Sequence, residues 1–269
     1  MLAVTHLRAS VSFLPSLHTV TSLQIHNIWA GSLIEFQHWK DILSSLKHLI
    51  SLVVNGDVVT SPTWISGGSV TLPVLRTLEI NVVDLEEPES DLFECLYDTI
   101  DAPLLECLLL HNYIDGDLAF LEDSWHLGAS KFPMLGTLVL SGLGEEVDSL
   151  NHFMQAFPHT QAVIFKAPMK GHLYEVLQLL QETDGPHPRY WPRLRHLTAI
   201  DLQFSDRDDM NELLLTCFVG RMSMGKPIET LALTRTDIDK LSVYDDGLFY
   251  QAEWMDLVKV VEYESDDEA

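Results

Sequence analysis

Apolar residues recur along this chain in one short phrase, a proline followed at fixed spacing by three apolar positions, P-x-L-x-x-L-x-L. Five copies keep the proline, and three weaker copies keep only the apolar spacing. The central apolar position falls at residues 23, 52, 78, 108, 138, 163, 197 and 231, so successive copies lie 25 to 34 residues apart. Such a period is typical of repeat architectures. The register near residue 197 is open, because Ile200 and Leu202 could fill the same slots.

Each phrase predicts a β-strand, and the segments between phrases predict helices. The L-x-L end alternates as a strand with one buried face does. The proline precedes the strand, where its missing N–H costs no ladder hydrogen bond. Apolar residues change to helical spacing, three to four apart, in residues 33–49, 89–100, 145–157, 172–185 and 206–222. The chain is therefore expected to alternate strand and helix.

This alternation fits several α/β architectures. A doubly wound α/β domain or an α/β barrel would also show it. The strand phrase is itself repeated, however, and has the form L-x-x-L-x-L of a leucine-rich repeat. We therefore predict an α/β leucine-rich-repeat solenoid, a horseshoe-like arc of about eight irregular repeats. Its parallel sheet would line the concave face, and its helices would cover the convex face.

The predicted array occupies residues 1–245, and two shorter segments follow it. Residues 246–262 have spaced apolar positions such as Trp254 and Val258, which predict a helix that caps the array or, alternatively, binds a partner. Residues 263–269 are acidic and predict a disordered tail, with an acidic docking peptide as the alternative. Because the first phrase begins near Val20, we also expect an exposed apolar edge at the N-terminal end of the array.

The irregular units, the P-x-L-x-x-L-x-L strands and the acidic C-terminus resemble the leucine-rich-repeat region of F-box-type proteins, particularly those of fungi. The resemblance covers about residues 15 to 240. It implies a solenoid that recognises protein substrates for an SCF-type ubiquitin ligase. The F-box itself, a helical module that docks the ligase adaptor, would precede the repeats. It is not expected in this chain, because the first phrase begins within about 20 residues of Met1.

Charge and cysteine content narrow the possible partners and compartments. With 40 acidic and 16 basic residues the formal charge is −24, which disfavours nucleic acid and anionic membranes as partners. Three cysteines without a C-x-x-C pair indicate a reducing compartment, the cytoplasm or nucleus. No apolar run is long enough to cross a membrane, and the first residues make a poor signal peptide.

No motif predicts catalysis, a cofactor or a metal. The glycines in residues 141–146 lack phosphate-loop spacing, the 12 histidines form no H-E-x-x-H, and the acidic clusters lack calcium-loop spacing. The sequence therefore predicts a non-catalytic protein-binding scaffold. The alternative is a hydrolase-like α/β enzyme with its active site at the carboxyl ends of the strands. Its best candidate cluster would be His111, Asp115 and Asp117.

In the solenoid, the partner would bind to side chains that alternate with the core leucines and point out of the concave face. The alternative is that these are only β-forming residues, or that loops cover them. We expect Val139→Asp to weaken partner binding while leaving folding largely intact. The candidates are Thr77, Glu79, Asn81, Leu109, His111, Thr137, Val139, Ser141, Ile164 and Lys166, and Cys107, Ala162, Thr230, Ala232 and Thr234 share their phase.

Overall fold

The computed structural model of the protein describes residues 2–4, 19–26, 36–56, 69–82, 92–112, 121, 131–143, 150–167, 170–202, 207–242 and 252–263. The chain divides into two compact units, Met1–Leu135 (unit 1) and Gly136–Ala269 (unit 2). Each unit contains parallel strands with helices between them, so the fold is α/β. The predicted fold class is confirmed at this level.

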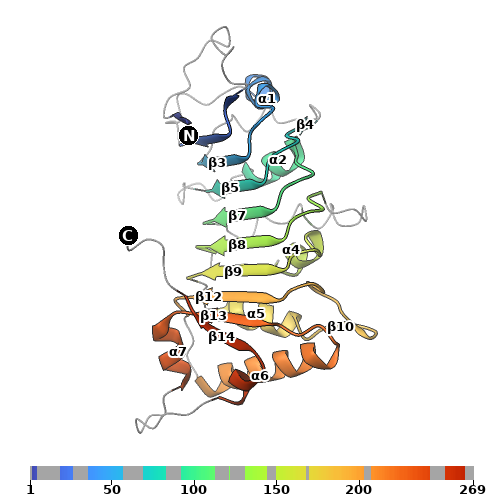
Figure 1. Ribbon diagram of the computed structural model, residues 1–269, viewed down its shortest axis with the longest axis vertical. Helices are drawn as coiled ribbons and strands as arrows, with labels where there is room; N and C mark the ends of the chain where they lie inside the picture. The colour runs from blue at the N-terminus through green and yellow to red at the C-terminus, as the bar shows by residue number, and fades with distance from the viewer. Residues whose placement is uncertain are drawn as a thin grey trace. The chain divides into compact units, whose positions relative to one another are not determined.

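Unit 1 contains five strands of the main sheet, each parallel to the next, as Figure 1 shows for β3, β5 and β7. In sheet order they are β1 (Leu2–Val4), β2 (Ser22–Ile25), β3 (Ser51–Asn55), β5 (Thr77–Asn81) and β7 (Cys107–His111). Its helices are α1 (Phe36–Ser45) and α2 (Leu92–Thr99), and the short strands β4 (Val70–Thr71) and β6 (Ile100–Asp101) pair separately. The central phrase residues Leu23, Leu52, Leu78 and Leu108 align across β2, β3, β5 and β7.

Unit 2 repeats this arrangement with more helix. Its strands are β8 (Thr137–Ser141), β9 (Ala162–Lys166), β12 (His196–Ile200), β13 (Thr230–Leu233) and β14 (Lys259–Glu262), again parallel in this order. Its helices are α4 (Leu150–Ala156), α5 (Lys170–Leu179), α6 (Arg207–Ser223) and α7 (Arg235–Ser242), with a small hairpin of β10 (Thr183–Asp184) and β11 (His187–Pro188). Leu197 aligns with Val163 and Leu231, which settles the register that the sequence left open.

One hydrogen-bonding pattern recurs where each phrase enters its strand. The carbonyl of Ile50 accepts from the N–H groups of both Arg76 and Thr77, and the carbonyl of Gln161 accepts from those of Arg195 and His196. The carbonyls of residues 21, 76, 136 and 195 each accept two N–H groups from the following phrase in the same way. Buried backbone groups must be paired, so the starts of these six strands are fixed to the phrase before them.

A second recurring feature lies at the other end of the strands. Five strands are followed by a residue with a positive φ: Gly56 (74°), Asn112 (61°), Gly142 (61°), Ala167 (48°) and Asp201 (59°). Glycine, asparagine and aspartate adopt this left-handed conformation most readily. Four of the five positions carry one of these residues. The chain therefore leaves successive strands through the same backbone turn.

The core consists of the apolar residues of the phrases and of the helices. In β5, Leu78 and Ile80 are fully buried, whereas Thr77, Glu79 and Asn81, which alternate with them, are only half-buried. Five helices (α1, α2, α4, α5 and α6) form in the five segments with helical spacing, and each buries apolar residues, such as Phe93 in α2. Thr160 stands where other phrases have leucine. It is buried there because its hydroxyl donates a 2.8 Å hydrogen bond to the carbonyl of Phe157.

Two expectations about the ends of the array were wrong. The predicted helix over 246–262 is replaced, where the structure describes it, by the 3-10 helix η5 (Glu253–Asp256) and by β14. Pairing with β13 and two β-branched valines favour the strand. The N-terminal edge of the sheet lies at β1 and not near Val20, because β1 pairs with β2. Thr234 does not belong to the sheet face: its hydroxyl accepts from the N–H of Asp237 at 3.1 Å and begins helix α7, which the sequence analysis missed.

Candidate functional site

Six of the residues singled out in the sequence lie side by side on β5 and β7, and we call them the face of unit 1. The two strands pair in register, residue against residue. All six side chains are half-buried, so each presents part of its surface outside the core. The face of unit 1 comprises Thr77, Glu79 and Asn81 on β5 and Cys107, Leu109 and His111 on β7.

Polar contacts link the two strands of this face. Nε2 of His111 lies 3.6 Å from Oε1 of Glu79, which forms an ion pair when the histidine is protonated. At the end of the strands, Nδ2 of Asn112 donates a 2.8 Å hydrogen bond to Oδ1 of Asn81. Burial, together with the charge of Glu79, raises the pKa of the Cys107 thiol. A thiol held protonated is a poor nucleophile, so Cys107 is poorly suited to act as one.

The remaining candidates lie on β8 and β9 of unit 2, and one of them was misjudged. Thr137, Ser141, Ile164 and Lys166 are half-buried, but Val139 is only 5% exposed. Alternation predicts which face of a strand a residue occupies, but not how densely that face is covered. The small Val139 side chain lies opposite Ile164. Val139→Asp would therefore bury a carboxylate, and we now expect it to destabilise the fold.

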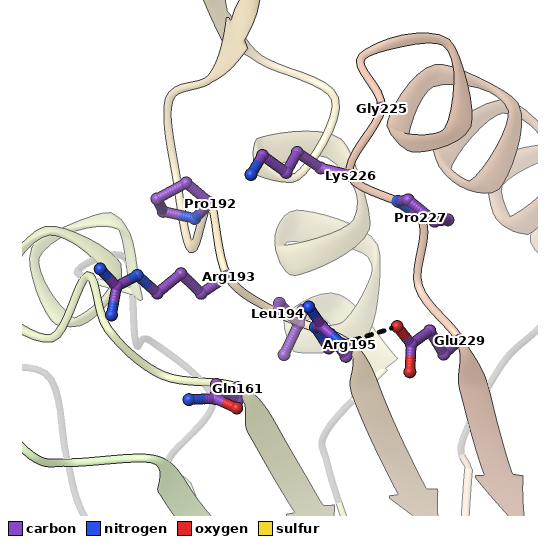
Figure 2. A pocket seen from close by; sticks show the side chains of 9 residues that line it. All are labelled: Gln161, Pro192, Arg193, Leu194, Arg195, Gly225, Lys226, Pro227 and Glu229. Atoms are coloured by element: carbon purple, nitrogen blue, oxygen red, sulfur yellow. Dashed lines mark ion pairs between the residues drawn. The ribbon is translucent and has the colours of Figure 1, made fainter.

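A groove of about 310 Å³ at the opposite ends of the strands in unit 2 was not found from the sequence. It crosses the turns that enter β9, β12 and β13, where the chain is most basic. Figure 2 shows Arg193 and Arg195 on one turn and Lys226 and Glu229 on the next. The groove is lined by Gln161, Pro192, Arg193, Leu194, Arg195, Gly225, Lys226, Pro227 and Glu229.

The groove carries an excess of positive charge. A guanidinium nitrogen of Arg195 lies 3.1 Å from Oε1 of Glu229, so these two charges offset each other. Arg193 and Lys226 form no ion pair with any carboxylate in the described part of the chain. Two cations thus remain available in the groove of a chain whose formal charge is −24.

A buried arginine holds the two walls of this groove together. Arg221 of α6 is 0% exposed. Its guanidinium donates to the carbonyls of Tyr190, Trp191 and Leu194 on one wall, at 3.1 to 3.3 Å. It also donates to the carbonyl of Lys226 on the other wall, at 3.1 Å. Burial lowers the pKa of Arg221, but a guanidinium stays protonated in proteins. Its charge therefore adds to the positive potential of the groove.

The backbone next to the groove, just before Pro192, is strained. Trp191 has a φ of 40°, in the left-handed region that a large side chain rarely adopts. The carbonyl of Trp191 accepts from both Arg221 and the N–H of Leu194. Strained backbone persists only where its surroundings hold it, and it is concentrated at functional sites. The sequence offered one signal for this site, the three arginines within residues 189–195.

The enzyme alternative is not tested by the structure. Of its candidate cluster, His111 belongs to the face of unit 1, while Asp115 and Asp117 lie outside the described residues. Among the residues that are described, no three His, Cys, Asp or Glu side chains gather as a metal site would require. A search of the same residues for a helix with the length and apolarity to span a membrane finds none.

Comparisons with known proteins do not place the chain in a family. No family model matches it, and no curated protein matches it. A Bacteroides fragilis protein, a structural-genomics target solved by crystallography, is similar to it with a TM-score of 0.43 and 16% identity. That similarity covers 93% of this chain and 68% of the other chain. At this level of similarity it carries no argument about fold or function.

Proposed function

We propose that this protein is a non-catalytic protein–protein interaction scaffold, built as a leucine-rich-repeat solenoid. Three local features support the repeat: the aligned central residues, a shared carbonyl acceptor before six strands and a left-handed residue after five. A closed α/β domain needs strands and helices, but it does not need most of its strands to begin or end in the same way. Repetition of this kind is what stacked repeats require.

The observation that carries the proposal is the composition of the face of unit 1. A half-buried apolar residue, Leu109, lies directly opposite Glu79 and is flanked by polar side chains of the same two strands. Protein interfaces combine an apolar centre with a polar rim in this way. A rigid, in-register sheet also loses little conformational entropy when a partner binds.

The resemblance to F-box-type proteins suggests what the partner is. In this version of the proposal, the face of unit 1 binds a protein substrate of an SCF-type ubiquitin ligase. The F-box would be supplied from outside the array. A partner that is not a ligase substrate would use the same face as a stand-alone scaffold.

The proposal is tested by affinity purification of the tagged full chain from its native cells, followed by quantitative mass spectrometry. We expect proteins that are recovered with the wild type and lost with Leu109→Asp, which places a charge at the apolar centre. Affinity for a purified partner should fall about tenfold or more, as for a central interface residue. Co-purified cullin-ligase components would support the ligase version.

The matched control is Met134→Asp, because Met134 is 57% exposed and lies outside the face of unit 1. Circular dichroism must show that both variants remain folded. If Leu109→Asp retains every partner that the wild type recovers, the face of unit 1 is not the docking surface. If Met134→Asp loses the same partners, the apolar turns of unit 1 bind them instead.

A further inference from the structure

We propose that the basic groove of unit 2 is a second binding site, which takes an acidic peptide segment of a partner protein. This inference goes beyond the scaffold function and does not depend on the face of unit 1. It starts from the two cations, Arg193 and Lys226, that no described carboxylate neutralises. Glu229 is held by Arg195 at 3.1 Å and offsets only one of the three rim cations.

The wall backbone of the groove argues against a phosphate ligand. Compact phosphate sites bind the anion with free backbone N–H groups. Here Pro192 and Pro227 have no N–H, and the N–H groups of Leu194, Arg195, Gly225, Lys226 and Glu229 all donate to backbone carbonyls. Of the lining N–H groups, only that of Arg193 has no backbone acceptor among the described residues, so the ligand must be recognised mainly by the basic side chains and the amide of Gln161. Such side chains match several separated carboxylates better than a single compact phosphate.

The dimensions of the groove fit an extended peptide. It crosses the turns before three adjacent parallel strands, β9, β12 and β13, and neighbouring strands lie about 4.8 Å apart. The groove therefore spans about 10 Å, and the turns that carry Arg193 and Lys226 are neighbours about 4.8 Å apart. In an extended peptide, side chains two residues apart on one side are separated by about 7 Å. Two carboxylates at this spacing can reach Arg193 and Lys226 together, and Figure 2 shows both cations rising from neighbouring turns.

Hydrogen bonds from Arg221 also hold the two turns that carry the cations in fixed positions. Arg221 joins the turn before β12 to the turn before β13 through four carbonyl hydrogen bonds. It does so although its own charge is buried without a carboxylate hydrogen bond in the described structure. A preorganised site loses less entropy on binding. The strained Trp191 lies within the same hydrogen-bonded turn.

The net negative charge of the chain does not prevent an acidic segment from binding in the groove. It makes binding of that segment elsewhere on the surface unfavourable. At physiological salt the Debye length is about 8 Å, so distant acidic residues are largely screened. The cations of the groove act at contact distance and are screened much less. An acidic segment should therefore be attracted here and repelled elsewhere on the surface.

The test measures fluorescence anisotropy of a labelled short peptide in which Glu alternates with Ala, at physiological salt, with the full chain. The same peptide with Gln in place of Glu should not bind. The double variant Arg193→Ser/Lys226→Ser should weaken binding about tenfold, as expected for two exposed ion pairs. The matched control, Arg235→Ser/Lys259→Ser, removes two exposed cations of unit 2 outside the groove. It should change binding less than about twofold.

Three outcomes would overturn the proposal. The wild type could fail to bind the Glu peptide. Both double variants could lose binding equally, which would indicate general charge attraction. A neutral peptide with one phosphoserine could bind while the Glu peptide does not, which would assign the groove to a phosphopeptide. Thermal unfolding followed by circular dichroism shows whether each variant is folded, and none of these outcomes bears on the face of unit 1.

Discussion

The two units use the same strand phrase but differ at one position that is exposed or half-buried, the residue between the proline and the first leucine. In unit 1 this residue is Val74, Leu104 or Met134, and the last two are 40% and 57% exposed. In unit 2 it is His159 or Arg193. The hydrogen bonds around the position are the same in both units, since the first-slot residue donates to the carbonyl three residues earlier.

This difference shows where such a chain can vary without cost to its fold. The leucine slots are buried and cannot change chemistry without a cavity or an unpaired polar group. The position beside them faces solvent and is free to be apolar in one unit and basic in the other. Unit 1 also has a hollow of about 600 Å³ at this edge, lined partly by Ile50 and Val74. The core phrases therefore set the fold, and the residues beside them distinguish the units.

Among the variants that test this difference between the units, Arg221→Met is expected to have the largest effect on stability. Among the described residues of unit 1, no arginine is buried as Arg221 is. The substitution keeps the apolar stem but leaves carbonyls of the groove walls without their donor. Each unpaired buried carbonyl costs about 1–3 kcal/mol, so unfolding free energy should fall by about 3 kcal/mol. Urea unfolding measures this loss, and Glu-peptide binding should weaken with it.

The control for this prediction is Arg235→Met, at an exposed arginine that pairs with Asp239 at 3.3 Å. It should change stability by about 0.5 kcal/mol or less. Equal stability of the wild type and Arg221→Met would mean that the groove walls hold without the guanidinium. The basic edge of unit 2 would then be no more rigid than the apolar edge of unit 1.

An effect of intermediate size is expected from the buried thiol of Cys217, which can be compared with the thiol of Cys107. Burial raises the pKa of Cys217, one turn before Arg221, from 9.0 to about 12, with Arg221 opposing the rise. Between these pH values the thiol stays protonated in the folded chain and ionises in the unfolded chain. Stability should therefore be unaffected below about pH 9 and fall by about 1.4 kcal/mol per pH unit above it.

The measurement is urea unfolding of the wild type and of Cys217→Ala at pH 8 and pH 10. Cys217→Ala loses core packing at both pH values, but its stability should fall less between them. Cys107, on the face of unit 1, also has a raised pKa but is only half-buried. A thiol reagent should modify Cys107 before Cys217. The reverse order would show that unit 2 opens more readily than unit 1.

The smallest effect on stability is expected at the residue with a positive φ that follows a strand. Ala167 has a φ of 48°, which glycine tolerates better. Ala167→Gly should therefore stabilise unit 2 by about 0.5 kcal/mol, measured by thermal or urea unfolding. The same substitution in the preceding strand, Ala162→Gly, should destabilise it by about 0.5–1 kcal/mol. If both lower stability, the shared exit turn does not constrain the chain as described.

Much of the fold could be predicted from the sequence because the phrase encodes burial directly. The central leucines align as the spacing predicted, and even Thr160 takes its slot by bonding its own hydroxyl. The face of unit 1 was predicted in the same way, since alternation places Glu79 and Leu109 on one side of adjacent strands.

The rest depends on partners that are distant in the sequence. Residues 259–262 form a strand because β13 lies beside them, and the adjacent valines are only a weak local signal for it. Val139 is buried because of how its face is covered. The groove could not be predicted because Arg193 and Lys226 are 33 positions apart, and a buried arginine brings their turns together.

The shared carbonyl before a strand also explains why the phrases need not be evenly spaced. Six strands, β3, β5, β7, β9, β12 and β13, are each fixed by two N–H groups to one oxygen of the preceding phrase. That contact does not depend on how much chain lies between, and the entropic cost of a longer connection grows only slowly with its length. Segments between phrases can therefore be lengthened, shortened or exchanged over evolution while the strands keep their alignment. New surfaces can thus arise on this protein by insertion, without redesign of its core.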